Sequence, residues 1–253
     1  MDLRLSRRVG IKLAGGVLVA ASTAIMPTAT AVPSNIAGMV VFIDPGHNGS
    51  NDGSINRQVP TGRGGTKDCQ TSGTATNTGY QEHTFTWDTA LRVRAELNAL
   101  GVRTALSRAN DNGLGPCVDE RANAANALHP NAILSIHADG GPPSGRGFHV
   151  NYSAPPLNQV QAGPSVQYAR IMRDQMQGSG IPPANYIGQN GLYGRSDLTG
   201  LNLAQYPSIL VECGNMKNPA DSALMESAEG RQKYADALVR GVAGFLASQG
   251  QAR

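Results

Sequence analysis

Short apolar runs that stop at turn-forming residues alternate along the chain with longer stretches of helical spacing. The apolar runs predict strands at 39–43, 102–106, 132–136 and 207–211, and an alternating pattern predicts a more exposed strand at 147–152. Apolar residues at helical spacing predict helices over 82–100, 118–128, 165–177 and 231–247. The predicted order is therefore β-α-β-α-β-β-α-β-α.

This alternation predicts the fold class. Parallel strands need crossover connections, and the crossover helices then cover the sheet. We therefore expect a single α/β domain over residues 32–253, with a mostly parallel, twisted sheet flanked by helices on both faces. No internal repeat or Pro-rich linker divides that range.

A long polar segment interrupts the alternation. Residues 48–79 consist mostly of Gly, Asn, Ser, Thr, Asp and Arg, and they follow the first predicted strand. A loop of this length is uncommon in a compact domain unless it is functional or mobile. Its position beside candidate chemistry favours a function.

The N-terminal residues 1–31 are typical of an export signal. Basic residues precede an apolar stretch over 13–26, and small residues at 29–31 suit cleavage before Val32. The alternative is a membrane anchor, but the stretch is shorter than the roughly 20 residues that a spanning helix needs. We expect a signal peptide and an exported protein, periplasmic, associated with the cell wall or secreted. The export route, Sec or twin-arginine, stays open.

The charge balance narrows the possible partners. The whole chain has a formal net charge of +3, but residues 32–253 hold 17 basic and 17 acidic residues. Nucleic-acid binding requires a clustered basic surface, and no Lys/Arg run follows the leader. We therefore expect no nucleic-acid partner and no membrane attachment after signal cleavage. Without a wall-binding module in this sequence, we expect a monomer.

Three cysteines occur, and none forms a C-x-x-C motif. An odd number in an exported protein suggests one disulfide and one remaining thiol. Cys69 and Cys117 lie in loop-like sequence, where a crosslink would restrain chain that lacks a core, whereas Cys213 ends an apolar run. We therefore expect a Cys69–Cys117 disulfide and a buried, free Cys213.

Candidate catalytic residues follow the predicted strands. Open parallel sheets bind ligands at the carboxyl ends of their strands. His47, His137 and Glu212 each follow a predicted strand, and Glu82 begins the helix after the long loop. Two imidazoles and a carboxylate can bind zinc with a coordination position left for water, and a further carboxylate can act as general base and acid.

Other interpretations of these residues remain open. A lone histidine after a strand is more often a loop hydrogen-bonding residue than a ligand. Glu82 also suits the first turn of a helix, and Glu212 suits a solvated strand end. His83, His129 and His149 are rival ligands.

Taken together, the motifs resemble the zinc-dependent N-acetylmuramoyl-L-alanine amidases of the type-3 amidase family over most of residues 39–245. Ile43-Asp44-Pro45-Gly46-His47 resembles the opening motif of that family, and Glu82 its isolated carboxylate ligand. Ser135-Ile136-His137-Ala138 resembles its second histidine motif, and Val211-Glu212-Cys213-Gly214-Asn215 its final motif. The long Cys69 loop is similar to that of small, single-domain mycobacterial members.

The resemblance implies hydrolysis of the amide that joins the lactyl group of N-acetylmuramic acid to L-alanine in peptidoglycan or muropeptide fragments. His47, Glu82 and His137 would bind one zinc ion, and Glu212 would be the general base and acid. Two alternatives are a zinc peptidase that cuts within the stem peptide and a noncatalytic peptidoglycan-binding or hydrolase-activating protein. Asp139 and Cys213-Gly214-Asn215-Met216 depart from the usual family pattern, which puts substrate preference in doubt.

Overall fold

The computed structural model describes residues 36–250. The predicted signal peptide over 1–31 lies outside the described residues, so the signal and the domain boundary at Val32 stay predictions. Among the helices of residues 36–250, none is both long and apolar enough to cross a membrane.

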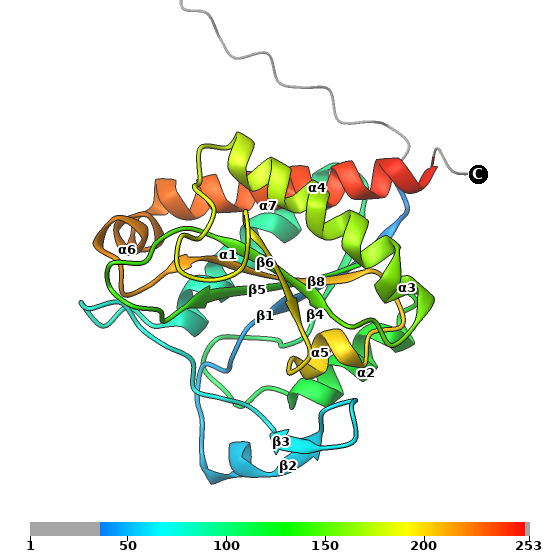
Figure 1. Cartoon of the computed structure of the whole chain (residues 1–253), viewed down its shortest axis with the longest axis horizontal. Coiled ribbons are helices and arrows are strands. Elements are labelled where there is room, and N and C mark those ends of the chain that lie inside the picture. Colours follow the sequence, from blue (N-terminus) through cyan, green and yellow to red (C-terminus); the bar gives the residue numbers. More distant parts are fainter. Residues whose placement is uncertain (1–35, 251–253) are drawn as a thin grey trace, which may run out of the picture. The chain divides into compact units, whose positions relative to one another are not determined.

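Six strands form a central sheet in the order β4-β1-β5-β8-β6-β7 (Figure 1). They are β1 Val40–Pro45, β4 Arg103–Leu106, β5 Ala132–Asp139, β6 His149–Ser153, β7 Leu192–Arg195 and β8 Ser208–Asn215. β4, β1, β5 and β8 are mutually parallel, β6 is antiparallel to β8, and β7 is parallel to β6. The predicted α/β class with a mostly parallel sheet is confirmed.

Helices cover both faces of the sheet (Figure 1). One face carries α1 Glu82–Ala99, α4 Pro164–Gly178 and α7 Ala228–Gly250, and the other carries α2 Val118–Ala127 and α5 Thr199–Asn202. The remaining helices are η2 Gly53–Asn56, α3 Gln159–Ala162 and α6 Pro219–Glu226. The four helices predicted from periodicity correspond to α1, α2, α4 and α7.

The two faces of the sheet differ in polarity because successive strand side chains point to opposite faces. In β1, Val41 and Ile43 belong to the large apolar core beneath α1, α4 and α7. Phe42 points to the other face, where it packs in a small cluster with Ala125 and Ile133. The second face therefore has room for polar side chains and for a cavity.

The polar segment 48–79 contains structure that the sequence did not predict. Strands β2 Gln58–Pro60 and β3 Thr66–Asp68 form a separate two-stranded antiparallel hairpin. Each strand has only three residues, too few to show a convincing alternation of apolar and polar positions. β7, α3 and α5, with four residues each, are also too short for a periodic pattern, and the longer α6 was likewise not predicted.

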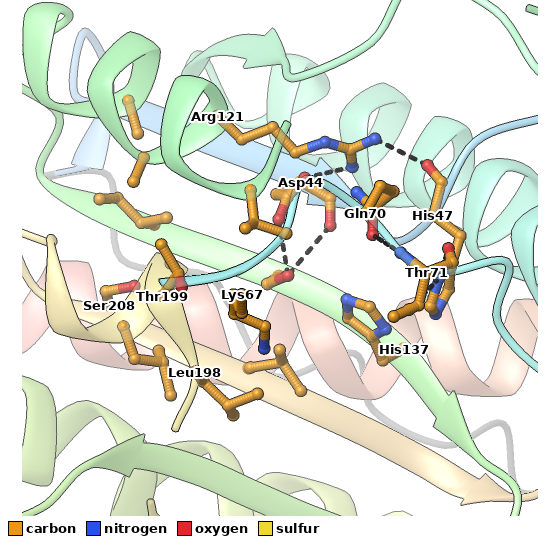
Figure 2. Close-up of a pocket in the computed structure, with 18 of the residues that line it drawn as sticks. Asp44, His47, Lys67, Gln70, Thr71, Arg121, His137, Leu198, Thr199 and Ser208 are labelled. Atoms are coloured by element: carbon orange, nitrogen blue, oxygen red, sulfur yellow. Dashed lines mark hydrogen bonds and ion pairs between the residues drawn. The ribbon is translucent and has the colours of Figure 1, made fainter. Parts of the chain in front are cut away.

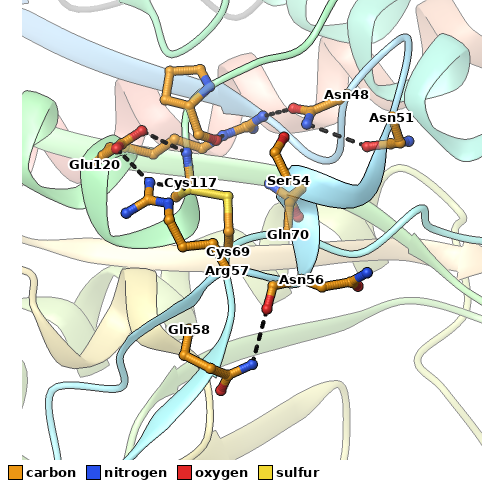
Figure 3. The surroundings of a disulfide bond; sticks show 12 residues. Asn48, Asn51, Ser54, Asn56, Arg57, Gln58, Cys69, Gln70, Cys117 and Glu120 are labelled. Carbon is orange, nitrogen blue, oxygen red and sulfur yellow. Dashed lines mark hydrogen bonds and ion pairs between the residues drawn. A yellow bond between two sulfur atoms is a disulfide. The ribbon is translucent and has the colours of Figure 1, made fainter.

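A disulfide joins the segment after this hairpin to the start of α2 (Figure 3). It links Cys69 to Cys117, the expected pair, and leaves Cys213 buried and free. Val59 packs against the disulfide in a small cluster that is separate from the main core. The crosslink thus restrains a segment with few apolar contacts of its own.

Removal of this crosslink should destabilise the protein. The bridged cysteines are 48 residues apart in sequence, and the chain-entropy model gives about 4 kcal/mol for closing such a loop. A variant with both Cys69→Ala and Cys117→Ala should lose about 2 to 4 kcal/mol of unfolding free energy in urea. Adding reductant should lower the stability of the wild type and leave that of the double variant unchanged. Equal stability of the wild type and the double variant in the absence of reductant would contradict this prediction.

Candidate metal centre

Three predicted ligands meet beside the carboxyl end of β1 and β5. His47 follows β1, His137 lies in β5, and Glu82 is the first residue of α1. One candidate ligand atom from each lies within 4.8 Å of the others. Glu82 Oε2 is 3.0 Å from His47 Nε2, and Glu82 Oε1 is 3.0 Å from His137 Nδ1. These side chains can hold a metal ion.

Glycines make the close approach of the three side chains possible. A Cβ on Gly46 would lie 2.3 to 2.6 Å from ring atoms of His137. Gly73 has a φ of +80°, and a Cβ there would lie 2.9 Å from both Glu82 and His47. Neither position therefore has room for a side chain, and glycine is required at both. His47 itself has a positive φ of 62°, a conformation that is uncommon outside glycine.

Hydrogen bonds orient the candidate ligands. His47 Nδ1 is 2.8 Å from the carbonyl oxygen of Thr71, and because a carbonyl only accepts, Nδ1 carries the hydrogen of this bond. The backbone N–H groups of Ala138 and Thr74 donate to Oε1 and Oε2 of Glu82, at 3.1 and 3.0 Å. The ligand atoms are therefore oriented before any ion binds.

A buried ion pair supports the loop that carries His47. Arg121 Nη1 donates to Asp44 Oδ1 at 2.9 Å and to the Pro45 carbonyl at 2.8 Å, and Nη2 donates to the His47 carbonyl at 2.7 Å (Figure 2). Asp44 also accepts hydrogen bonds from Ser107 and Ser135. This network holds the strained backbone at His47 in place.

The charges of these groups reflect their surroundings. Burial by itself would raise the pKa of Glu82, but His47 and the hydrogen bonds from both histidines lower that pKa below its usual range. Burial opposes the charged form of His47, yet the Glu82 carboxylate raises the pKa of this imidazole. The Arg121 guanidinium and the Ser107 hydroxyl overcome burial and lower the pKa of Asp44 to about 2.

Glu212 lies on β8 directly beside His137. The parallel register pairs the two residues, and the antiparallel register pairs Glu212 with His149 of β6. Burial, followed by the negative charges of Glu82 and Asp139, raises the pKa of Glu212 well above its usual value. Its Oε2 is buried and has no hydrogen-bond partner in the structure. Glu212 as a whole is half-buried, so its side chain is not fully enclosed.

The rival histidines lie apart from the ligand cluster. His83 pairs with Asp111, and His129 contacts Tyr206 through Nδ1. His149 is buried beside Glu212, where burial lowers its pKa to about 4 and favours the neutral ring. Sequence reasoning missed this neighbour, although its alternation with apolar residues in 147–152 could have placed it on the polar face.

Tyr186 completes the polar surroundings on the β6 side of Glu212. Its hydroxyl donates to Asp139 Oδ2 at 2.9 Å. Asp139 occupies the position where the sequence departs from the usual family pattern. A tyrosine about fifty residues away in sequence could not be assigned to this contact without the tertiary structure.

A mostly parallel sheet that brings together two imidazoles and a buried carboxylate able to hold a metal ion, with a half-buried second carboxylate alongside, is the arrangement expected of a metal-dependent hydrolase. Comparison with known proteins gives the same class. A family model described as N-acetylmuramoyl-L-alanine amidase matches residues 41–244. The chain belongs to this N-acetylmuramoyl-L-alanine amidase family and is a hydrolase of peptidoglycan.

Similar proteins come from mycobacteria. The N-acetylmuramoyl-L-alanine amidase Rv3717 of Mycobacterium tuberculosis is 84% identical over 94% of this chain and 99% of its own length. The crystal structure of the N-acetylmuramyl-L-alanine amidase Ami1 of Mycobacterium smegmatis is 77% identical, covers 85% of this chain and 99% of that one, and superposes with a TM-score of 0.84. The apo form of Ami1 from Mycobacterium abscessus is 64% identical, covers 83% of this chain and 100% of that chain, and has a TM-score of 0.83.

A side chain at residue 46 should disrupt the ligand cluster. Gly46→Ala places a Cβ against the ring of His137, so the imidazole must move away from Glu82. We expect metal affinity to fall at least about tenfold, as for other changes next to metal ligands. Competition with a chromophoric chelator measures the affinity. Gly53→Ala is the matched control, because a Cβ there meets nothing within 4 Å. Equal affinity of the two variants would refute the prediction.

The Asp44 carboxylate should make folding stability depend on pH. Its pKa is about 2 in the folded protein, against a reference of 3.8. The stabilisation is therefore full above about pH 4 and is lost as the pH falls towards 2, by about 2 kcal/mol in total. Asp44→Asn should remove this part of the acid dependence of the unfolding free energy, measured in urea between pH 6 and pH 2.5. The control Asp174→Asn, at an exposed position, should retain this part of the acid dependence.

Proposed function

We propose that the chain is a zinc-dependent amidase that hydrolyses the bond between the lactyl group of N-acetylmuramic acid and L-alanine of the stem peptide. The observation that carries this proposal is the convergence of His47, Glu82 and His137 beside Glu212. Family membership supports the choice of bond, because the family is described by that activity.

The donor set favours zinc. Two imidazole nitrogens and one carboxylate are typical of catalytic zinc sites, which keep a position open for water or substrate. When bound, zinc would lower the pKa of a water molecule and polarise the scissile carbonyl group. His47 Nε2, His137 Nδ1 and a carboxylate oxygen of Glu82 would hold the ion.

Glu212 would move the protons. Its carboxylate would accept a proton from the attacking water and then donate a proton to the nitrogen of the leaving alanine. The ionised form is needed for the first step, whereas burial and neighbouring carboxylates oppose it. A cation at the adjacent ligand cluster would offset that opposition, because opposite charge favours the ionised carboxylate.

The substrate would be peptidoglycan or a soluble muropeptide fragment outside the cytoplasm. The Cys69–Cys117 disulfide supports action in an oxidising compartment. We propose that residues 1–31 direct export, that the mature chain acts as a monomer, and that it binds neither membrane nor nucleic acid.

The proposal is tested with purified residues 32–253 and a muramyl dipeptide. Mass spectrometry should detect release of the free peptide. A chelator should abolish this release, and added zinc should restore it. Cleavage only inside a longer stem peptide would indicate a peptidase. An absence of turnover on fragments and intact sacculi, with zinc bound, would indicate a binding or activating protein.

Loss of the Glu212 carboxylate should separate catalysis from metal binding. Glu212→Gln keeps the shape of the side chain but cannot accept the water proton. We expect kcat to fall about 10² to 10⁴-fold with zinc content unchanged by atomic absorption. Glu229→Gln, at an exposed position on α7, is the control. Substantial activity in Glu212→Gln would exclude this role for the residue.

A further inference from the structure

Three basic side chains meet at the end of β7. Arg195 is the last residue of this strand, and its Nε and Nη2 donate to the two carboxylate oxygens of Asp197 at 2.7 and 2.5 Å. Lys67 of β3 donates to the Asp197 carbonyl oxygen at 3.2 Å. Arg63, in the turn of the hairpin, donates to Ser153, which pairs with Arg195 in the register of β6 and β7. We call Arg63, Lys67, Arg195 and Asp197 the basic cluster.

The basic cluster has a surplus of positive charge. Among residues 36–250, Asp197 is the only carboxylate to which its three cations donate hydrogen bonds. Arg63 donates to neutral oxygens, and Lys67 donates to a backbone carbonyl. Asp68, which follows Lys67 in sequence, accepts a hydrogen bond from Gln58 instead. A further carboxylate would therefore be attracted to this cluster.

The charged groups of the cluster can be reached from solution. The side chain of Arg195 is 24% exposed and that of Asp197 is 62% exposed, and Lys67 is half-buried. The two-bond contact with Asp197 shows that the Arg195 guanidinium is oriented to bind a carboxylate, which is the group that its planar shape matches best. The third nitrogen of Arg195, Nη1, takes no part in that contact.

Two aromatic rings connect the basic cluster to Glu212. Because side chains alternate along a strand, Tyr193 and Arg195 point to the face of the sheet that carries His149 and Glu212. The guanidinium carbon of Arg195 is 5.1 Å from the centre of the Tyr193 ring, and that centre is 6.0 Å from the centre of the His149 ring. Burial raises the pKa of Glu212, and the charge of Arg195 partly opposes that rise, as expected of groups that lie on one face.

Lys67 places the basic cluster beside the metal ligands as well. Together with His47 and His137, Lys67 lines a cavity of about 130 Å³ (Figure 2). In the proposed reaction Glu212 donates a proton to the leaving nitrogen, so the stem peptide lies next to Glu212. The β5 side of Glu212 holds the acidic Asp139, whereas the β7 side holds the cations. An anionic peptide is therefore favoured on the β7 side.

We propose that the basic cluster binds a carboxylate of the leaving stem peptide, an inference that rests on the proposed function. The lactyl carboxyl group is used in the scissile amide, but a second residue that is linked through the γ-carboxyl of glutamate keeps an α-carboxylate close to that amide. Arg195 would donate to this carboxylate, Lys67 would add a second positive charge, and the Asp197 carboxylate would compete for the guanidinium. The cluster thereby favours stem peptides whose second residue is ionised over those in which it is amidated.

The wild-type protein tests the ligand directly. Its kcat/KM is compared on three muramyl-L-alanyl-D-glutamyl substrates that carry a free α-carboxylate, a free γ-carboxylate or neither, with the remaining carboxyl groups amidated. We expect the α-carboxylate substrate to exceed the diamide about fivefold at low ionic strength, mainly through KM. The ratio should fall towards one in about 0.5 M NaCl, because salt screens partly exposed charges. A larger value for the γ-carboxylate substrate would identify the more distant carboxylate as the ligand.

Variants assign the preference to the cluster. Arg195→Gln removes the positive charge and should lower the ratio of kcat/KM on the α-carboxylate substrate to that on the diamide towards one. Asp197→Asn removes the competing negative charge and should raise that ratio. A merely structural role of the pair would change kcat/KM on both substrates equally. Arg173→Gln is the matched control, because Arg173 of α4 forms a similar ion pair with Asp174, and it should leave the ratio unchanged.

The outcomes separate this inference from the proposed function. If the zinc-loaded wild type cleaves none of the substrates at the lactyl–alanine bond, the proposed function fails. If it cleaves all three equally well at low ionic strength, the amidase stands and the assignment of the basic cluster is overturned. Should Arg195→Gln not fold, Asp197→Asn at its exposed position still decides: an unchanged or lower ratio would overturn the assignment.

Discussion

The buried carboxylate of Glu82 lies between two imidazoles, with one oxygen 3.0 Å from His47 and the other 3.0 Å from His137. A charge in such a position is costly unless it is paired and hydrogen-bonded. The two rings and the N–H groups of Ala138 and Thr74 provide those partners. This requirement brings together β1, β5, the start of α1 and the segment after the hairpin, all of which must be in place for the carboxylate to be tolerated.

The two faces of the sheet contribute differently to holding these groups in place. One face buries a large apolar core under α1, α4 and α7, which anchors β5 and β8. The opposite face is left to polar groups, and Arg121 reaches across it from α2 to bind Asp44 and the His47 carbonyl. Stability and chemistry are therefore placed on opposite sides of the same strands.

The hairpin of β2 and β3 depends on contacts with distant parts of the chain. Its turn carries Arg63, which donates hydrogen bonds to Asn202 of α5 and Ser153 of β6. Its other end is tied to α2 by the disulfide at Cys69 (Figure 3). A polar segment with few apolar contacts is thereby held over the cavity and supplies part of its wall.

Local patterns along the chain were sufficient to predict the α/β class, four of the helices, and the position of His47 after a strand. His137 and Glu212 were predicted to follow their strands, but they lie within β5 and β8, which continue two and three residues further. Local patterns succeed because burial imposes a period of two on strands and about 3.6 on helices, and because parallel strands end at one edge. The antiparallel direction of β6, the hairpin, the position of His149 beside Glu212 and the basic cluster around Asp197 were decided only by the tertiary structure. Each depends on register or on contacts between residues far apart in sequence, and neither leaves a local pattern in the chain.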